Sequence, residues 1–170
     1  MKQIGLMSDT HGFVDPKIYE HFKNVDEIWH AGDIGDIKVI DELKKFKPLR
    51  AVWGNIDNTE IRSETEEFET FECEKVKVLI THIAGKPGKY YPKAKERIDI
   101  DKPDLFICGH SHICLVKMDP NYKMLWMNPG ACGFKGFHQI KTLLRFKITG
   151  DKIHDLEVIE MGKRAWNKIF

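Results

Sequence analysis

Seven side chains that can bind metal ions recur in short segments along the chain: Asp9, His11, Asp33, Asn55, His82, His110 and His112. Two carboxylates, four imidazoles and one carboxamide provide oxygen and nitrogen donors without any thiolate. That donor set suits Mn²⁺, Fe, Zn²⁺, Co²⁺ or Ni²⁺ better than Ca²⁺ or Mg²⁺ alone. Seven ligands are more than one ion takes from protein, but they fit two ions about 3.5–4 Å apart that share a bridging carboxylate.

Each of these side chains lies at or near the end of a short apolar run that predicts a buried strand, over residues 3–7, 27–29, 49–53, 76–81 and 105–108. Helical spacing of apolar residues over 16–22 and 37–46 separates the first three runs. Strand–helix–strand units imply a parallel sheet, and functional groups gather at the carboxyl ends of its strands. We therefore expect the seven side chains at one edge.

The second half of the chain is rich in strand-like segments, over 68–73, 113–118, 124–127, 140–148 and 153–159, with one helical stretch at about 90–98. The sequence thus predicts an α/β fold with two sheets in a sandwich and helices outside, as a single domain over residues 1–170. Lys and Arg number 27 and Asp and Glu 26, a net charge of +1 that excludes the strongly basic signature of a general nucleic-acid binder.

The four cysteines, Cys73, Cys108, Cys114 and Cys132, show no CxxC spacing. This argues against a thiolate zinc site and predicts reduced, mostly buried cysteines. There is no apolar run long enough for a secretory leader or a membrane span. We therefore expect a cytoplasmic protein with no membrane partner.

The order Asp-x-His, Gly-Asp, Gly-Asn-x-Asp, His, Gly-His-x-His resembles the calcineurin-like metallophosphoesterases, and more narrowly their small single-domain bacterial and archaeal phosphodiesterases. The match runs from Asp9 to about Gly130. The resemblance implies an αββα sandwich. It also implies that one metal is held by Asp9, His11, Asp33 and His112, and the other by Asp33, Asn55, His82 and His110. Asp33 would then bridge the two ions.

The resemblance further implies hydrolysis of phosphate esters, diesters first, by a metal-bridging water that attacks in line. Asn55 and His110 would also help to place the phosphoryl group. Mn²⁺ is the first choice of metal, and the substrate is expected to be a small or nucleotide-like phosphate ester. An extended nucleic acid is not expected, because the chain has no length for a capping domain. The alternatives are a phosphomonoesterase and a non-catalytic protein-binding scaffold of the same fold, such as a subunit of the retromer complex.

Two positions depart from the family pattern. Ile56 stands where many members have a histidine that contacts substrate and protonates the leaving group. Its absence favours esters with good leaving groups. His82 is followed by Ile83-Ala84 rather than by glycine, so the loop after this ligand differs, and substrate choice with it.

Other polar residues have a structural interpretation beside a functional one. His30 is predicted to be a core histidine rather than a group that orients a ligand, and three further histidines are interpreted as ordinary surface or structural residues: His21, His138 and His154. Asp36 and Asp57 either orient ligands or are solvated turn residues. The basic stretch from Lys86 to Lys102 is either a solvated helix or a rim that attracts phosphate. Trp53, Trp126 and Phe134 are expected in the core, and Trp166 in the C-terminal tail is a candidate homodimer contact.

Overall fold

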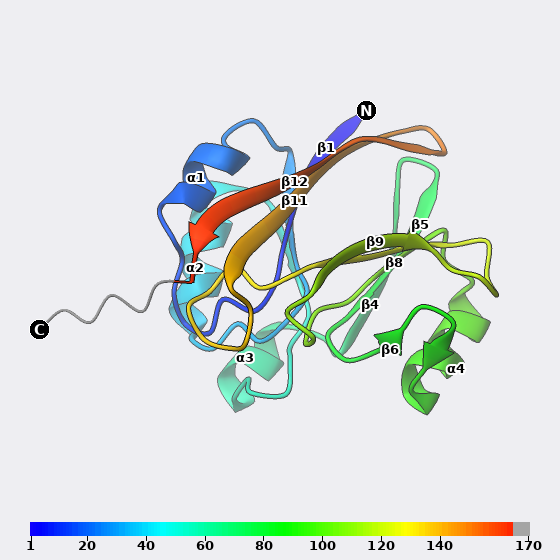
Figure 1. Cartoon of the computed structure of the whole chain (residues 1–170), viewed down its shortest axis with the longest axis horizontal. Coiled ribbons are helices and arrows are strands. Elements are labelled where there is room, and N and C mark those ends of the chain that lie inside the picture. The colour runs from blue at the N-terminus through cyan, green and yellow to red at the C-terminus, as the bar shows by residue number, and fades with distance from the viewer. Residues whose placement is uncertain (165–170) are drawn as a thin grey trace, which may run out of the picture.

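The computed structural model describes residues 1–164, and its strands form two five-stranded sheets that face each other (Figure 1). The first sheet has, in spatial order, β12 (Lys152–Lys163), β11 (Ile140–Thr149), β1 (Lys2–Met7), β2 (Glu27–His30) and β3 (Leu49–Ala51). The second has β4 (Phe68–Cys73), β5 (Val76–Thr81), β8 (Leu105–Ile107), β10 (Leu125–Pro129) and β9 (Cys114–Met118). β1, β2 and β3 are parallel, as their strand–helix–strand pattern predicts, and β5, β8 and β10 are parallel as well.

Strands near the middle of the sandwich are apolar on both faces, because each sheet is covered on both sides. In β5, Val78 and Ile80 pack into the cluster between the sheets, whereas Leu79 packs under α4 (Pro92–Asp101). On the outer side of the first sheet, α1 (Lys17–Phe22) and α2 (Ile37–Phe46) bury Phe22 and Leu43. Figure 1 shows these helices flanking the sandwich. The predicted two-sheet fold is confirmed.

Three short elements are absent from the sequence prediction. The helix α3 (Thr59–Glu64) begins where the Asn58 side chain accepts a hydrogen bond from Ile61 N at 3.1 Å. The strands β6 (Gly85–Lys86) and β7 (Lys89–Tyr90) form a small hairpin, so the predicted helix starts at Pro92 rather than at Tyr90. None of the three is long enough to show a hydrophobic period.

Several smaller expectations can also be checked. All four cysteines are free, with Cys114 half-buried and the others buried. Trp126 lies in the core, but Trp53 and Phe134 are only half-buried, and each has a cationic side chain over its ring, Arg62 and Lys141 respectively. Among the described helices, none has the length and apolarity needed to cross a membrane. Trp166 lies outside the described residues.

Candidate metal centre

The seven predicted ligands lie beyond the carboxyl ends of the parallel strands. Asp9 and His11 follow β1, Asp33 follows β2, and Asn55 follows β3. His82 follows β5, and the last two histidines follow β8. Six of them form two groups whose ligand atoms lie within 4.8 Å of one another: Asp9, His11 and His112, then Asp33, His82 and His110. The edge predicted from the sequence is therefore formed by both sheets together.

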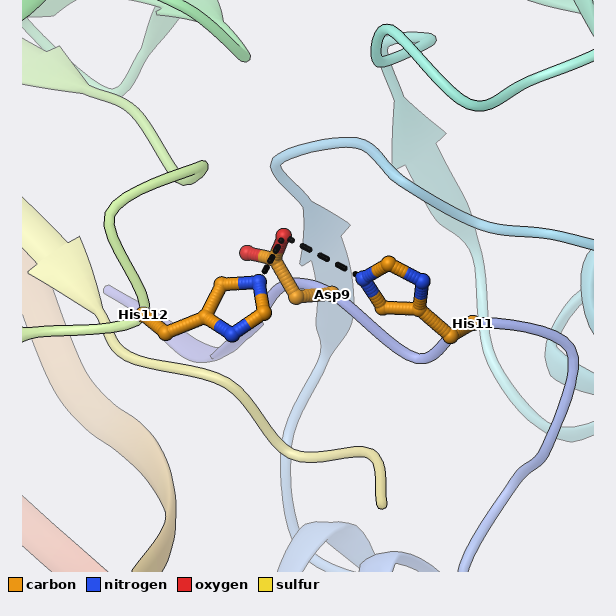
Figure 2. A group of neighbouring side chains, drawn as sticks. All are labelled: Asp9, His11 and His112. Carbon is orange, nitrogen blue, oxygen red and sulfur yellow. Dashed lines mark ion pairs between the residues drawn. The ribbon is translucent and has the colours of Figure 1, made fainter. Parts of the chain in front are cut away.

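In the first group, Asp9 lies between two imidazoles (Figure 2). Its Oδ1 atom is 3.0 Å from His112 Nε2 and 3.9 Å from His11 Nε2. Its Oδ2 atom accepts hydrogen bonds from the Ser8 hydroxyl at 2.6 Å and from His110 N at 3.3 Å. The second oxygen thus fixes the carboxylate, and the first is left facing the two rings.

In the second group, Asp33 Oδ1 lies 3.2 Å from His82 Nε2. The other ring nitrogen of His82 donates to the Ala31 carbonyl at 2.7 Å, which leaves Nε2 to face the carboxylates. His110 is exposed, and its Nδ1 lies 3.0 Å from Asn55 Oδ1. Asn55, the seventh predicted ligand, thus contacts the second group through the His110 ring.

The two groups adjoin each other. Asp33 Oδ2 is 3.6 Å from His11 Nε2 of the first group, and Asp9 Oδ1 is 3.8 Å from His82 Nε2 of the second. Asp33 thus presents one oxygen to each group, which is the arrangement that a bridging carboxylate requires.

Three ligand atoms in these groups are buried without a hydrogen-bond partner among the described residues: Asp9 Oδ1, His11 Nε2 and His82 Nε2. Buried polar atoms are nearly always paired, because leaving one unpaired costs about 1–3 kcal/mol. Converging lone pairs on a carboxylate and two imidazoles are what a divalent cation would satisfy. The residues present therefore fit the metal ions that the sequence predicts.

Protonation also fits this assignment. Burial lowers the pKa of His11 and of His110, which favours the neutral imidazoles that metal binding needs. Burial alone would also lower the pKa of His82, but Asp33 and Asp9 outweigh burial and raise it. A cation bound between His82 and the two carboxylates would compete with the proton on the His82 ring.

The backbone at the site is unusual. Five of the predicted ligands have a left-handed conformation, with φ between 49° and 69°: Asp9, His11, Asp33, His110 and His112. This conformation is uncommon for residues with a side chain and clusters at functional sites. The glycines beside them permit close approach, since a Cβ on Gly54 would lie 2.1 Å from Asp33 Oδ1 and one on Gly109 would lie 2.2 Å from Ser8 Oγ.

The core interpretation of His30 is confirmed. Its Nδ1 accepts from Gly32 N at 3.1 Å, and its Nε2 lies 3.0 Å from the Thr10 hydroxyl. Burial lowers the pKa of His30 to about 4, so the ring is neutral near pH 7. The Thr10 hydroxyl donates to the Ile34 carbonyl, so His30 joins the loops after β1 and β2.

Asp57 is not a solvated turn residue. It is 4% exposed, and its carboxylate accepts from the backbone amides of Ile34, Gly35 and Gly54 at 2.8–3.1 Å. It therefore ties the loop that carries Asp33 to the loop that carries Asn55. Asp36 instead caps α2 by accepting from Lys38 N at 2.9 Å.

The sequence interpretation missed His138. Its Nε2 donates to the Gly133 carbonyl at 2.8 Å, so in the neutral ring Nδ1 is an acceptor, 3.3 Å from His112 Nδ1. Burial lowers the pKa of His138 and favours that neutral form. The contact fixes the ring of His112 with Nε2 toward Asp9. Gly136 leaves room for the His112 ring, because a side chain at this position would collide with His112 Nδ1. The glycines around His138 were the only signal in the sequence.

Comparison with known proteins agrees with this geometry. The model of the calcineurin-like phosphoesterase superfamily domain matches residues 1–151. The chain belongs to this superfamily. Among its relatives is a probable metallophosphoesterase of Methanothermobacter thermautotrophicus, 27% identical over 94% of this chain and 92% of that protein.

Two solved structures resemble this one. One, described as a novel archaeal phosphodiesterase, is 26% identical, covers 92% of this chain and 99% of its own, and superposes with a TM-score of 0.69. The other is Vps29 of Entamoeba histolytica complexed with Zn²⁺, 12% identical, covering 96% of this chain and 99% of its own, with a TM-score of 0.71. The second likeness concerns the fold alone. Membership of the superfamily supports a metal-binding phosphoesterase.

Proposed function

We propose that the protein hydrolyses phosphate esters, diesters in preference to monoesters, with two divalent cations held at the strand ends. The observation that carries this proposal is the convergence of Asp9 Oδ1, His11 Nε2 and His82 Nε2, all buried and without a hydrogen-bond partner among the described residues. A fold gains nothing in stability from such atoms. Cations bound there would satisfy all three atoms.

In this proposal one ion is held by Asp9, His11, Asp33 and His112, and the other by Asp33, Asn55, His82 and His110. Mn²⁺ is the first choice of metal, with Zn²⁺, Fe, Ni²⁺ and Co²⁺ as alternatives for the same donors. Divalent ions at such a site supply Lewis acidity, which lowers the pKa of water and neutralises charge on phosphoryl oxygens.

The chain's own residues position the reacting groups. Asp33 provides negative charge between His11 and His82, and so keeps two cations close to each other. Asn55 and His110 lie at the exposed side of the second group, where a phosphoryl group would enter. Ile56, next to Asn55, is 46% exposed and offers no proton to a leaving group. Good leaving groups are therefore part of the proposal.

The diester preference is supported by the relative described as an archaeal phosphodiesterase, which covers 92% of this chain. A monoesterase is the alternative within enzymes. A protein-binding scaffold is the alternative from another class, and the fold shared with Vps29 is compatible with it. The complete set of ligand atoms argues against a scaffold, which has no need of them. A cytoplasmic location and a single domain over residues 1–170 also belong to the proposal.

The test compares bis-(4-nitrophenyl) phosphate with 4-nitrophenyl phosphate on the Mn²⁺-loaded protein. We expect a higher kcat/KM for the diester, and a loss of both activities in His82→Ala. A higher kcat/KM for the monoester would replace the diesterase with the monoesterase. Bound metal without hydrolysis of any ester would favour the scaffold.

A further inference from the structure

A pocket of about 580 Å³ adjoins the candidate metal centre. The loop after β8 forms one wall of this pocket through Gly109, His110 and Ser111. Because His110 is also a candidate ligand, the pocket and the metal centre share a wall. A phosphate held at the metals would therefore lie beside the pocket. The pocket is thus placed to contact the part of a substrate that differs from one phosphate ester to another.

The remaining walls are mainly apolar. Tyr91, Ile113 and Leu115 line the pocket while 56%, 65% and 39% exposed. Trp126 also lines it, and its indole Nε1 is buried without a hydrogen-bond partner within residues 1–164. Small-molecule sites have this composition, with apolar and aromatic walls and a few polar groups, and volumes of roughly 300–1,000 Å³.

The pocket is held in shape by the β6–β7 hairpin. The Tyr90 hydroxyl donates a short hydrogen bond to the Asp119 carboxylate, which also accepts from Gly88 N at 2.8 Å. The Tyr90 ring packs edge-on against Phe106, with centroids 5.6 Å apart. The hydroxyl and ring of Tyr90 are thus engaged within the protein. Tyr91, by contrast, presents an exposed ring on which a planar group can stack.

The pocket also carries positive charge. Lys86 and Lys89 line it and stand directly opposite each other in the hairpin. Like charges in directly opposed positions destabilise a strand pair. In the described part of the chain neither lysine forms an ion pair, whereas Lys93, Lys95 and Arg97 of α4 each pair with an acidic side chain. An anionic ligand would relieve the repulsion between the two hairpin lysines.

We propose that this pocket binds the nucleoside part of a nucleotide-like phosphodiester, with the base stacked on Tyr91 and with Lys86 and Lys89 near the anionic phosphate that the metal centre holds. The inference rests on the proposed phosphoesterase function, because the metal centre holds the phosphate. It goes further in naming the substrate class. Of the two interpretations of the basic stretch after His82, the hairpin lysines support the phosphate-attracting rim.

The test is calorimetric titration of the Mn²⁺-loaded protein with adenosine 5′-monophosphate and with methyl phosphate, which share a phosphate and differ in the nucleoside. We expect the nucleotide to bind at least about tenfold more tightly. Tyr91→Ala should weaken nucleotide binding about five- to 100-fold, the range for loss of one base-stacking contact, and leave methyl phosphate unchanged. Tyr91→Phe keeps the ring and should bind as the unmodified protein does.

Ile100→Ala is the matched control, because Ile100 is a 67% exposed apolar residue of α4 outside the pocket. Equal affinity for the two ligands, or equal weakening of both by Tyr91→Ala, would overturn the pocket assignment. If the protein hydrolyses diesters but binds the nucleotide no more tightly than methyl phosphate, the pocket assignment is wrong and the catalytic proposal stands. If it binds the nucleotide through Tyr91 but hydrolyses no ester, the catalytic proposal is wrong and the pocket assignment stands.

Discussion

The space between the two sheets and the carboxyl ends of the same strands differ sharply. Between the sheets, buried apolar side chains such as Leu6, Ile80 and Leu144 pack on one another. Just beyond the ends of β1 and β5, the buried atoms Asp9 Oδ1 and His82 Nε2 have no hydrogen-bond partner among the described residues, and left-handed backbone appears at Asp9. The sandwich thus provides the stability, while the strand ends give up stability for a binding site.

The largest effect is expected from Asp33→Asn. The neutral amide is a poorer bridge and does not offset the charge of two cations, so turnover should fall by more than the roughly 10–100-fold typical of residues that only support a ligand. In metal-free protein the free energy of unfolding should fall modestly, because the charged carboxylate is favoured in the folded state: burial opposes it, but His82 and the Ile56 amide outweigh burial and lower the pKa of Asp33. We would measure the number of bound metal ions, the turnover rate, and the free energy of unfolding by urea denaturation. Asp41→Asn, on the exposed side of α2, is the control. Two bound metals with near-normal rates would refute the bridge.

Leu144→Ala probes the other side of the comparison. Leu144 is fully buried between the sheets, so the cavity should cost about 2–5 kcal/mol of unfolding free energy. Turnover per folded molecule should stay the same. Leu156→Ala, at a 39% exposed position of β12, should change the unfolding free energy by about 0.5 kcal/mol or less. A large loss of metal affinity in folded Leu144→Ala would mean that the two regions are not separable.

His138→Ala should have an intermediate effect. Without its ring, His112 Nδ1 loses its partner and the orientation of the ligand is no longer fixed. Loss of such support typically costs 10–100-fold in metal affinity or activity. Metal affinity measured by titration against a competing chelator distinguishes this role from a purely structural one. His154→Ala, beside Thr149 at the far end of β11, is the control. Equal affinities in the two variants would make His138 an ordinary structural residue.

At Ile56 the effect is expected in how the rate depends on the leaving group, not in metal binding or stability. Rates should fall steeply as the pKa of the leaving group rises, since general acid catalysis, which typically contributes about 10²–10⁴-fold, is missing. His30 and Asp57 cannot supply the proton, because both are buried and bound to the surrounding loops. Ile56→His has room at a 46% exposed position and should flatten the slope, whereas Ile56→Leu should not. A shallow slope in the unmodified enzyme would show that another group donates the proton.

The site was predictable where a ligand directly follows a strand. Asp9, Asp33 and His82 each follow an apolar run within three residues, so their place at strand ends was predictable, although both sheets are needed to bring the three together. The support given by His138 depends on a loop between β10 and β11 that folds back over His112, and no local pattern encodes that distance. The pocket was likewise beyond sequence reasoning, because it arises where the β6–β7 hairpin meets the loop after β8.

The most direct test of the two-metal proposal is to strip the protein with excess chelator and titrate Mn²⁺ back, while counting bound ions and measuring hydrolysis of bis-(4-nitrophenyl) phosphate. Imidazoles bind metal only when neutral, so the titration belongs near neutral pH or above. We predict no hydrolysis in the stripped protein and full activity only when two ions are bound per chain. Hydrolysis that persists in excess chelator, with no metal in the sample, would contradict the proposal.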